Sequence, residues 1–134
     1  MTRRALITGA AGFAGRHLSR RLEGNGWETL RSDREGEGCV PCDFGVPGDI
    51  DALIDGAEGI THVFHLAART FVPESMSDPS GAFQVNLLGT VHLLARLSRL
   101  SAPPRETGQY ELRGLARAGM IEGAHPDDLK LGNA

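Results

Sequence analysis

The chain has 134 residues, 40% of them hydrophobic and 23% charged, with a formal net charge of −3. That length fits a single domain, and the mildly acidic balance gives no electrostatic reason to expect nucleic acid or an anionic membrane as a partner. No apolar run approaches the roughly 20 residues of a membrane span, and no signal-peptide pattern follows Met1. We therefore expect a cytoplasmic protein.

Strand and helix patterns alternate over the first hundred residues. In chain order, the sequence predicts a strand at 3–8, a helix at 13–24, strands at 27–33 and 39–42, a helix at 49–54, a strand at 62–68 and a long helix at 79–99. Such alternation is typical of an α/β fold with right-handed crossovers. We expect a Rossmann-like parallel sheet of about four core strands in the order 3-2-1-4, flanked by helices. The long helix is apolar on more than one face, which predicts cover by more than a single layer.

The pattern changes after residue 100. A breaker-rich stretch around Pro103-Pro104 follows the long helix, and only a weak helix at 109–118 and a short strand at 129–131 are indicated beyond it. We expect a domain at 1–100 and an irregular tail at 101–134. Without a fifth strand the sheet edge beside the strand at 61–66 would be open, so it should recruit the tail or another chain, which predicts self-association or poor solubility.

A glycine-rich turn joins the first strand to the first helix. It reads Thr8-Gly9-Ala10-Ala11-Gly12-Phe13-Ala14-Gly15, which is a G-x-x-G-x-x-G spacing. Gly9 can make a tight turn out of the strand, Gly12 lets backbone approach a pyrophosphate, and Gly15 lets helix and strand pack closely. The helix start then directs its N–H groups and positive dipole end toward the phosphates. The turn therefore predicts a dinucleotide site.

An acid follows at the end of the second predicted strand. Asp33 lies 18 residues after Gly15, where a carboxylate can accept hydrogen bonds from the adenosine ribose and would repel a 2′-phosphate. This favours NAD, while the neighbouring Arg34 leaves NADP as the alternative. The competing interpretation of Asp33 is a solvated turn acid.

Four motifs in order resemble the extended short-chain dehydrogenase/reductases, the epimerase/dehydratase family that acts on nucleotide sugars. They are the glycine turn at 8–15, Asp43-Phe44, His65-Leu66-Ala67-Ala68 and Asn86-Leu87-Leu88-Gly89-Thr90. The stretch from Phe71 to Ser75 and Asp78-Pro79 resemble the subgroup of GDP-mannose 4,6-dehydratase and GDP-4-keto-6-deoxymannose reductase. Thr61 departs from the pattern, because the family more often has an acid there.

The resemblance implies a role for each matched position. Asp43 would contact the adenine amine, Phe44 would flank the ring, and the backbone of Leu66-Ala67-Ala68 would pass the ribose and pyrophosphate. The residues predicted to bind NAD, or alternatively NADP, are Gly9, Gly12, Phe13, Ala14, Gly15, Asp33, Arg34, Asp43, Phe44, Leu66, Ala67 and Ala68. A complete member of this family would transfer hydride to and from a nucleotide sugar, which is the second expected ligand.

The catalytic half of the family pattern is missing. The family uses Tyr-x-x-x-Lys, since a lysine one helical turn away lowers the pKa of the tyrosine hydroxyl. Here the single tyrosine, Tyr110, is followed four residues on by Gly114, and the single lysine is Lys130. We assign no catalytic residue and expect an internal deletion near 100–108 together with a missing C-terminal remainder. The alternative to an enzyme of this family is a catalytically inactive dinucleotide-binding module or a truncated remnant that lacks the Tyr-x-x-x-Lys site.

Other polar residues have simpler interpretations. Cys39-x-Pro41-Cys42 could suggest redox or metal chemistry, but no helix signal starts directly after Cys42 and further ligands are not obvious. His62 and His65 should face opposite sides of the sheet. The remaining candidates divide into a solvated helix face (Asp49, Asp51 and Asp55) and residues that could approach a ligand or simply cap and hold loops (Glu74, Ser75 and Asn86).

Overall fold

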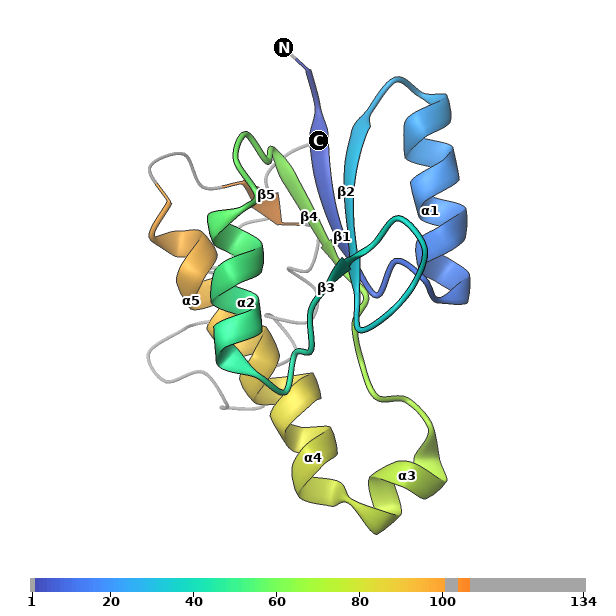
Figure 1. Ribbon diagram of the computed structural model, residues 1–134, viewed down its shortest axis with the longest axis vertical. Helices are drawn as coiled ribbons and strands as arrows, with labels where there is room; N and C mark the ends of the chain where they lie inside the picture. Colours follow the sequence, from blue (N-terminus) through green and yellow to red (C-terminus); the bar gives the residue numbers. More distant parts are fainter. Residues whose placement is uncertain (1, 101–103, 107–134) are drawn as a thin grey trace, which may run out of the picture.

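The computed structural model describes residues 2–100 and 104–106, which form one parallel sheet with helices on both faces (Figure 1). The strands are β1 (Arg4–Thr8), β2 (Glu28–Asp33), β3 (Val40–Pro41), β4 (His62–His65) and β5 (Arg105–Glu106). Their order is β3-β2-β1-β4-β5, and every pairing is parallel. The α/β Rossmann-like fold and the predicted order 3-2-1-4 are therefore confirmed.

The fifth strand was not predicted. Its two residues pair with His62 and Val63 of β4, and they come immediately after the buried Pro104. Sequence patterns identify strands from longer apolar runs, so a two-residue strand next to two prolines gives no signal. The open edge expected beside β4 is thus partly closed by a segment of the same chain.

The helices are α1 (Phe13–Gly24), α2 (Pro47–Asp55), α3 (Val72–Ser77), α4 (Pro79–Phe83) and α5 (Gly89–Ser98), with a π-helical segment η1 (Gln84–Leu88) between the last two. The predicted long helix is therefore α4, η1 and α5 in succession. Helix α3 was not predicted, and none of its residues is buried. The predicted helix at 109–118, the strand at 129–131, Tyr110 and Lys130 lie outside the described residues.

Two apolar layers hold the sheet between its helices. Successive side chains of β1 point to opposite faces, so Ala5 and Ile7 pack with Leu18 and Leu22 of α1, while Leu6 packs on the other face. That second face is the larger core, to which α2 and α5 contribute Ile50, Leu53, Ile54, Leu93 and Leu97. Figure 1 shows α1 on one side of the sheet and α2 with α5 on the other.

The outer face of the long helix is less covered than its sequence suggests. Phe83, Leu88 and Val91 are 53%, 44% and 40% exposed, so the expectation of more than one covering layer is wrong for these positions. The apolar side chains on the inner face, such as Leu93 and Leu97, meet the sheet and α2. In the part of the chain that the structure describes, no helix is both long and apolar enough to span a membrane.

Asp51 and Asp55 of α2 remain partly in contact with solvent, with side-chain exposures of 43% and 72%, but they also have partners on α5. Asp51 accepts from His92 Nε2 at 2.8 Å and lies 3.0 Å from Arg96 Nε, and Asp55 is 2.5 Å from the other end of the same guanidinium. These contacts join α2 to α5 at the rim of the core. The paired residues are about forty positions apart in the chain, and the fold brings their two helices together. No local sequence pattern could predict these contacts.

Candidate functional site

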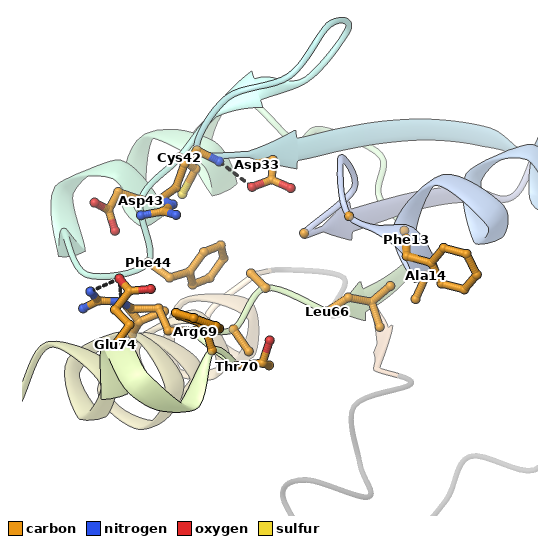
Figure 2. A pocket seen from close by; sticks show the side chains of 18 residues that line it. Phe13, Ala14, Asp33, Cys42, Asp43, Phe44, Leu66, Arg69, Thr70 and Glu74 are labelled. Carbon is orange, nitrogen blue, oxygen red and sulfur yellow. Dashed lines mark hydrogen bonds and ion pairs between the residues drawn. The ribbon is translucent and has the colours of Figure 1, made fainter. Parts of the chain in front are cut away.

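A cavity of about 420 Å³ lies at the carboxyl ends of β1, β2 and β4 (Figure 2). All of the residues predicted to bind the dinucleotide line it. Six others join them, namely Cys42, Arg69, Thr70, Phe71, Glu74 and Val85. Phe71 and Glu74 belong to the Phe71–Ser75 stretch that the sequence already singles out, and Glu74 is among the residues expected to be able to approach a ligand. The other four, Cys42, Arg69, Thr70 and Val85, each stand next to one of the quoted motifs, so extending each motif by one residue would have found them.

The cavity forms where β1 and β4 lie side by side and the chain leaves them toward opposite faces of the sheet. In open α/β sheets this switch point is the usual place for a ligand. Gly9 has a φ of +66°, and a Cβ added to it would lie 2.8 Å from both the Ala67 nitrogen and the Leu66 carbonyl carbon. The turn after β1 and the loop after β4 are therefore in direct backbone contact, and only glycine fits between them.

Gly12 and Gly15 meet different requirements. A Cβ on Gly15 would lie 2.4 Å from the Gly9 oxygen, so this glycine allows α1 to pack onto the end of β1. Gly12 is the N-cap of α1 and has no side-chain cap, and a Cβ there would meet only the Gly9 oxygen, at 3.3 Å. Gly12 thus has one close contact, with a backbone oxygen, and it also lines the cavity. The first turn of α1 also contains no acidic residue that would oppose an anion.

Asp33 is held in place by backbone groups on both sides of its carboxylate. One oxygen accepts from the Ala11 nitrogen at 3.0 Å and the other from the Arg34 nitrogen at 2.7 Å. The Asp33 carbonyl also accepts from the Cys42 nitrogen at 2.9 Å, which ties the end of β2 to the residue after β3. An ordered carboxylate on the cavity wall differs from the solvated turn acid that was the alternative interpretation.

Asp43 is positioned by the start of α2. Its backbone nitrogen donates to Asp49 at 3.0 Å, and its carboxylate accepts from the Gly45 nitrogen at 2.8 Å. Asp49 is an acid in the first turn of α2, and its side chain anchors the loop before that helix. Phe44 is only 4% exposed, and its ring centroid lies 4.8 Å from that of His65. Phe44 therefore forms part of the floor beneath Asp43.

The two cysteines do not form a reactive pair. Burial raises the pKa of the Cys42 thiol to about 11, and the carboxylates of Asp49 and Asp43 add to this rise. A thiol with that pKa stays protonated at neutral pH and is a poor nucleophile. Both cysteines are free, and within residues 2–100 and 104–106 no group of three or more His, Cys, Asp or Glu side chains is arranged to hold a metal ion.

The two histidines of β4 face opposite sides of the sheet, as expected. The His62 ring packs edge-on against Trp27 at 4.7 Å, whereas the His65 ring lies on the cavity side next to Phe44. Burial lowers the pKa of His65 to about 4, so the ring is neutral at physiological pH. His65 contacts the cavity floor without being part of the cavity lining.

A second polar cluster fixes the wall after β4. The Asn86 side chain accepts from the Arg69 nitrogen at 2.7 Å and donates to the Arg69 oxygen at 2.9 Å. The Arg69 guanidinium pairs with Glu74 and, at 3.1 Å, with Asp78. A hydrogen bond from the Gly81 nitrogen and the pairing with Arg69 lower the pKa of Asp78. Asn86 and Glu74 thus have structural partners, in line with the simpler of their two interpretations.

Known proteins resemble this chain in sequence. The model of the NAD dependent epimerase/dehydratase family matches residues 5–105. The GDP-6-deoxy-D-mannose reductase of Pseudomonas aeruginosa is 36% identical over 99 residues, an alignment that covers 72% of this chain and 30% of the reductase.

Two solved structures share the fold. The UDP-glucose 4-epimerase of Thermus thermophilus, in complex with NAD, has a TM-score of 0.63 and 32% identity over 74% of this chain and 35% of the epimerase chain. RMD from Pseudomonas aeruginosa, complexed with NADPH, has a TM-score of 0.63 and 33% identity over 79% of this chain and 33% of RMD. The chain spans about a third of the length of the relatives that it matches.

Proposed function

Because this chain belongs to the NAD dependent epimerase/dehydratase family, we propose that its cavity binds a nicotinamide adenine dinucleotide. The observation that carries the proposal is the state of Gly12. It is the N-cap of α1, it lines the cavity, and a Cβ there would meet one protein atom within 4 Å, the Gly9 oxygen at 3.3 Å. The fold therefore restricts Gly12 less tightly than Gly9 and Gly15, and a ligand that approaches the backbone closely accounts for a glycine here.

The start of α1 suits the pyrophosphate. The first N–H groups of a helix have no partner within the helix, and together with the helix dipole they favour a negative charge. No acid stands in the first turn of α1 to oppose that charge. The backbone of Phe13, Ala14 and Gly15, which all line the cavity, would donate to the phosphate oxygens.

The adenosine half would occupy the end of the cavity near Asp33. The fixed carboxylate of Asp33 is placed to accept from ribose hydroxyls, and it would repel a phosphate on the 2′ position. We therefore propose NAD as the preferred form, with Arg34 as the residue that would receive the 2′-phosphate of NADP. By resemblance to the family, Asp43 would contact the adenine amine and Phe44 the ring.

When bound, the nicotinamide supplies a hydride acceptor or donor, and in this family the expected partner is a nucleotide sugar. The sequence of this chain contains no Tyr-x-x-x-Lys to move the accompanying proton. We therefore propose dinucleotide binding without turnover by this chain alone. Incubation with NAD or NADP and GDP-mannose should give no product and no change in nicotinamide absorbance, and turnover under these conditions would contradict the proposal.

Binding is tested by calorimetric titration with NAD and NADP. Gly12→Asp should weaken binding of both by at least about 100-fold, because a carboxylate would occupy the phosphate position, while an N-cap aspartate keeps the helix stable. Gly48→Asp is the matched control, since it adds the same charge in the first turn of α2, where a Cβ meets nothing within 4 Å. Absence of binding by the wild type, or equal binding by Gly12→Asp, would refute the proposed function.

We also propose that the chain associates with itself. The apolar side chains on α4, η1 and α5 are exposed to water, which is unfavourable. Contact with a second copy of the chain would remove these side chains from water.

A further inference from the structure

The two ring nitrogens of His65 connect β4, to which this residue belongs, with two other parts of the molecule. Nδ1 lies 2.6 Å from the Thr8 hydroxyl, at the end of β1, and Nε2 lies 3.0 Å from the Thr90 hydroxyl, at the start of α5. The two threonines are both buried, with exposures of 0% and 5%. The imidazole therefore spans the sheet and the long helix directly beneath the switch point.

The direction of each hydrogen bond follows from the partners. The Thr90 hydroxyl donates its one proton to the Asn86 carbonyl at 2.9 Å, so its oxygen must accept from Nε2–H of His65. The ring is neutral and carries its single proton on Nε2, which leaves Nδ1 as an acceptor. The Thr8 hydroxyl therefore donates to Nδ1.

Because the Thr8 hydroxyl donates its proton to His65, its oxygen can accept hydrogen bonds from backbone N–H groups of the cavity wall. The Leu66 and Ala67 nitrogens donate to it at 3.1 Å and 3.2 Å. These two peptides line the cavity, and they are the ones that a Cβ on Gly9 would touch. The Leu66 nitrogen also donates to the Thr8 carbonyl at 3.2 Å, whereas the Ala67 nitrogen donates to the hydroxyl. The Thr8 hydroxyl therefore adds to the backbone contact and holds the loop after β4 against the glycine turn.

We propose that His65 is a positioning residue for the dinucleotide cavity, because it accepts the Thr8 hydroxyl proton and thereby fixes the Leu66–Ala67 wall against Gly9. The inference rests on the proposed function, since the wall matters only if a ligand is bound there. If His65 had only a structural role, it would act through its hydrogen bond to Thr90 and its packing on Phe44. Its substitution would then have no specific effect on ligand affinity.

Two substitutions separate these roles. His65→Asn keeps an acceptor near the Nδ1 position but cannot reach Thr90, whereas His65→Gln keeps a donor near the Nε2 position but leaves the Thr8 hydroxyl without its acceptor. Both remove the ring, so both should lower the melting temperature by similar amounts. Calorimetry should show NAD affinity within about threefold of wild type for His65→Asn and about tenfold weaker for His65→Gln.

A second pair of variants keeps the imidazole and covers the case in which a His65 variant does not fold. Thr8→Val removes the hydroxyl that His65 holds and should weaken NAD binding about as much as His65→Gln does. Thr90→Val removes the Nε2 partner together with the hydrogen bond to the Asn86 carbonyl, keeps the Thr8 contact, and should leave the affinity unchanged. Equal NAD affinities for His65→Asn and His65→Gln, or for Thr8→Val and Thr90→Val, would overturn the inference while the proposed function stands. A wild type that binds no dinucleotide would overturn both.

Discussion

At the scale of single residues, Gly9, Gly12 and Gly15 share one motif but satisfy three different constraints. Gly9 needs a positive φ and contact with the loop after β4, Gly15 needs contact with the turn residues Gly9 and Ala10, and Gly12 has one looser contact, with the Gly9 oxygen at 3.3 Å. The spacing of the motif already predicts a separate role for each of the three. The clearances give the physical reason for glycine at the two positions that the fold itself restricts most tightly, Gly9 and Gly15.

Gly15→Ala should destabilise the protein. The new methyl would lie 2.4 Å from the Gly9 oxygen and 2.6 Å from the Ala10 Cα, so α1 would have to move away from the sheet. We expect a loss of about 1–3 kcal/mol in the free energy of unfolding, measured by urea denaturation. Gly24→Ala, at the other end of the same helix and with nothing within 4 Å, is the control and should be neutral or slightly stabilising. Equal stability of the two variants would contradict the close packing at Gly15.

His65 should make the stability of the protein depend on pH in a defined window. Burial lowers its pKa from 6.5 to about 4, so between these values the unfolded chain holds a proton that the folded chain does not. The stability contributed by the neutral ring is complete above about pH 6.5 and is lost as the pH falls toward 4, by up to about 3 kcal/mol. Urea denaturation at several pH values should show this loss in the wild type, and His65→Asn should lack that component of the slope.

At the scale of elements, the sequence predicts what local pattern determines and misses what distant contacts determine. The alternation of apolar runs was sufficient to predict β1, β2 and β4. It also predicted the helical segments α2 and α5 on the second face of the sheet. It could not indicate α3, which buries no residue and whose Glu74 pairs with Arg69 outside the helix. It also predicted one continuous long helix instead of a helix interrupted by the π-helical segment η1, because the extra residue of a π turn could not be recognised in the apolar spacing.

The contact between α2 and α5 gives a prediction at this scale. Asp51 is partly exposed and bridges His92 and Arg96, so its charge should contribute about 0.5–1 kcal/mol to the free energy of unfolding. This contribution should be smaller at high salt, because dissolved ions screen exposed charges. A double-mutant cycle with Asp51→Asn and Arg96→Met should yield a coupling energy of that size at low ionic strength. A coupling that does not change with salt would mean that the side chains act by packing rather than by charge.

At the scale of the whole molecule, the sequence was sufficient for the fold class and for a set of residues that the structure gathers around one cavity. It was not sufficient for the network beneath that cavity. Thr8 and His65 are 57 residues apart, and His65 and Thr90 are 25 apart, so their contact exists only once the sheet and the long helix have assembled. A threonine and a histidine in separate motifs give no sign of it.

Self-association is the prediction that belongs to the whole molecule. Phe83, Leu88 and Val91 remain exposed on α4, η1 and α5, and exposed apolar side chains favour contact with a second copy. Sedimentation should show dimers or larger species for the wild type and a shift to monomer for the double variant Phe83→Asp, Leu88→Lys. Arg20→Glu, on an exposed position of α1, is the control for altered surface charge and should associate as the wild type does. A monodisperse wild-type monomer would contradict the prediction.

The position of Trp27 has a practical consequence. It is the single tryptophan of the chain, and it stands just before β2, packed between Arg3, His62 and Phe64. The cavity lies at the opposite, carboxyl ends of the strands. Intrinsic indole fluorescence should therefore report whether the sheet is folded and change little when the cavity fills. For this protein, indole fluorescence can follow folding while calorimetric titration with NAD follows occupancy, so that a variant that cannot fold is distinguished from one that cannot bind.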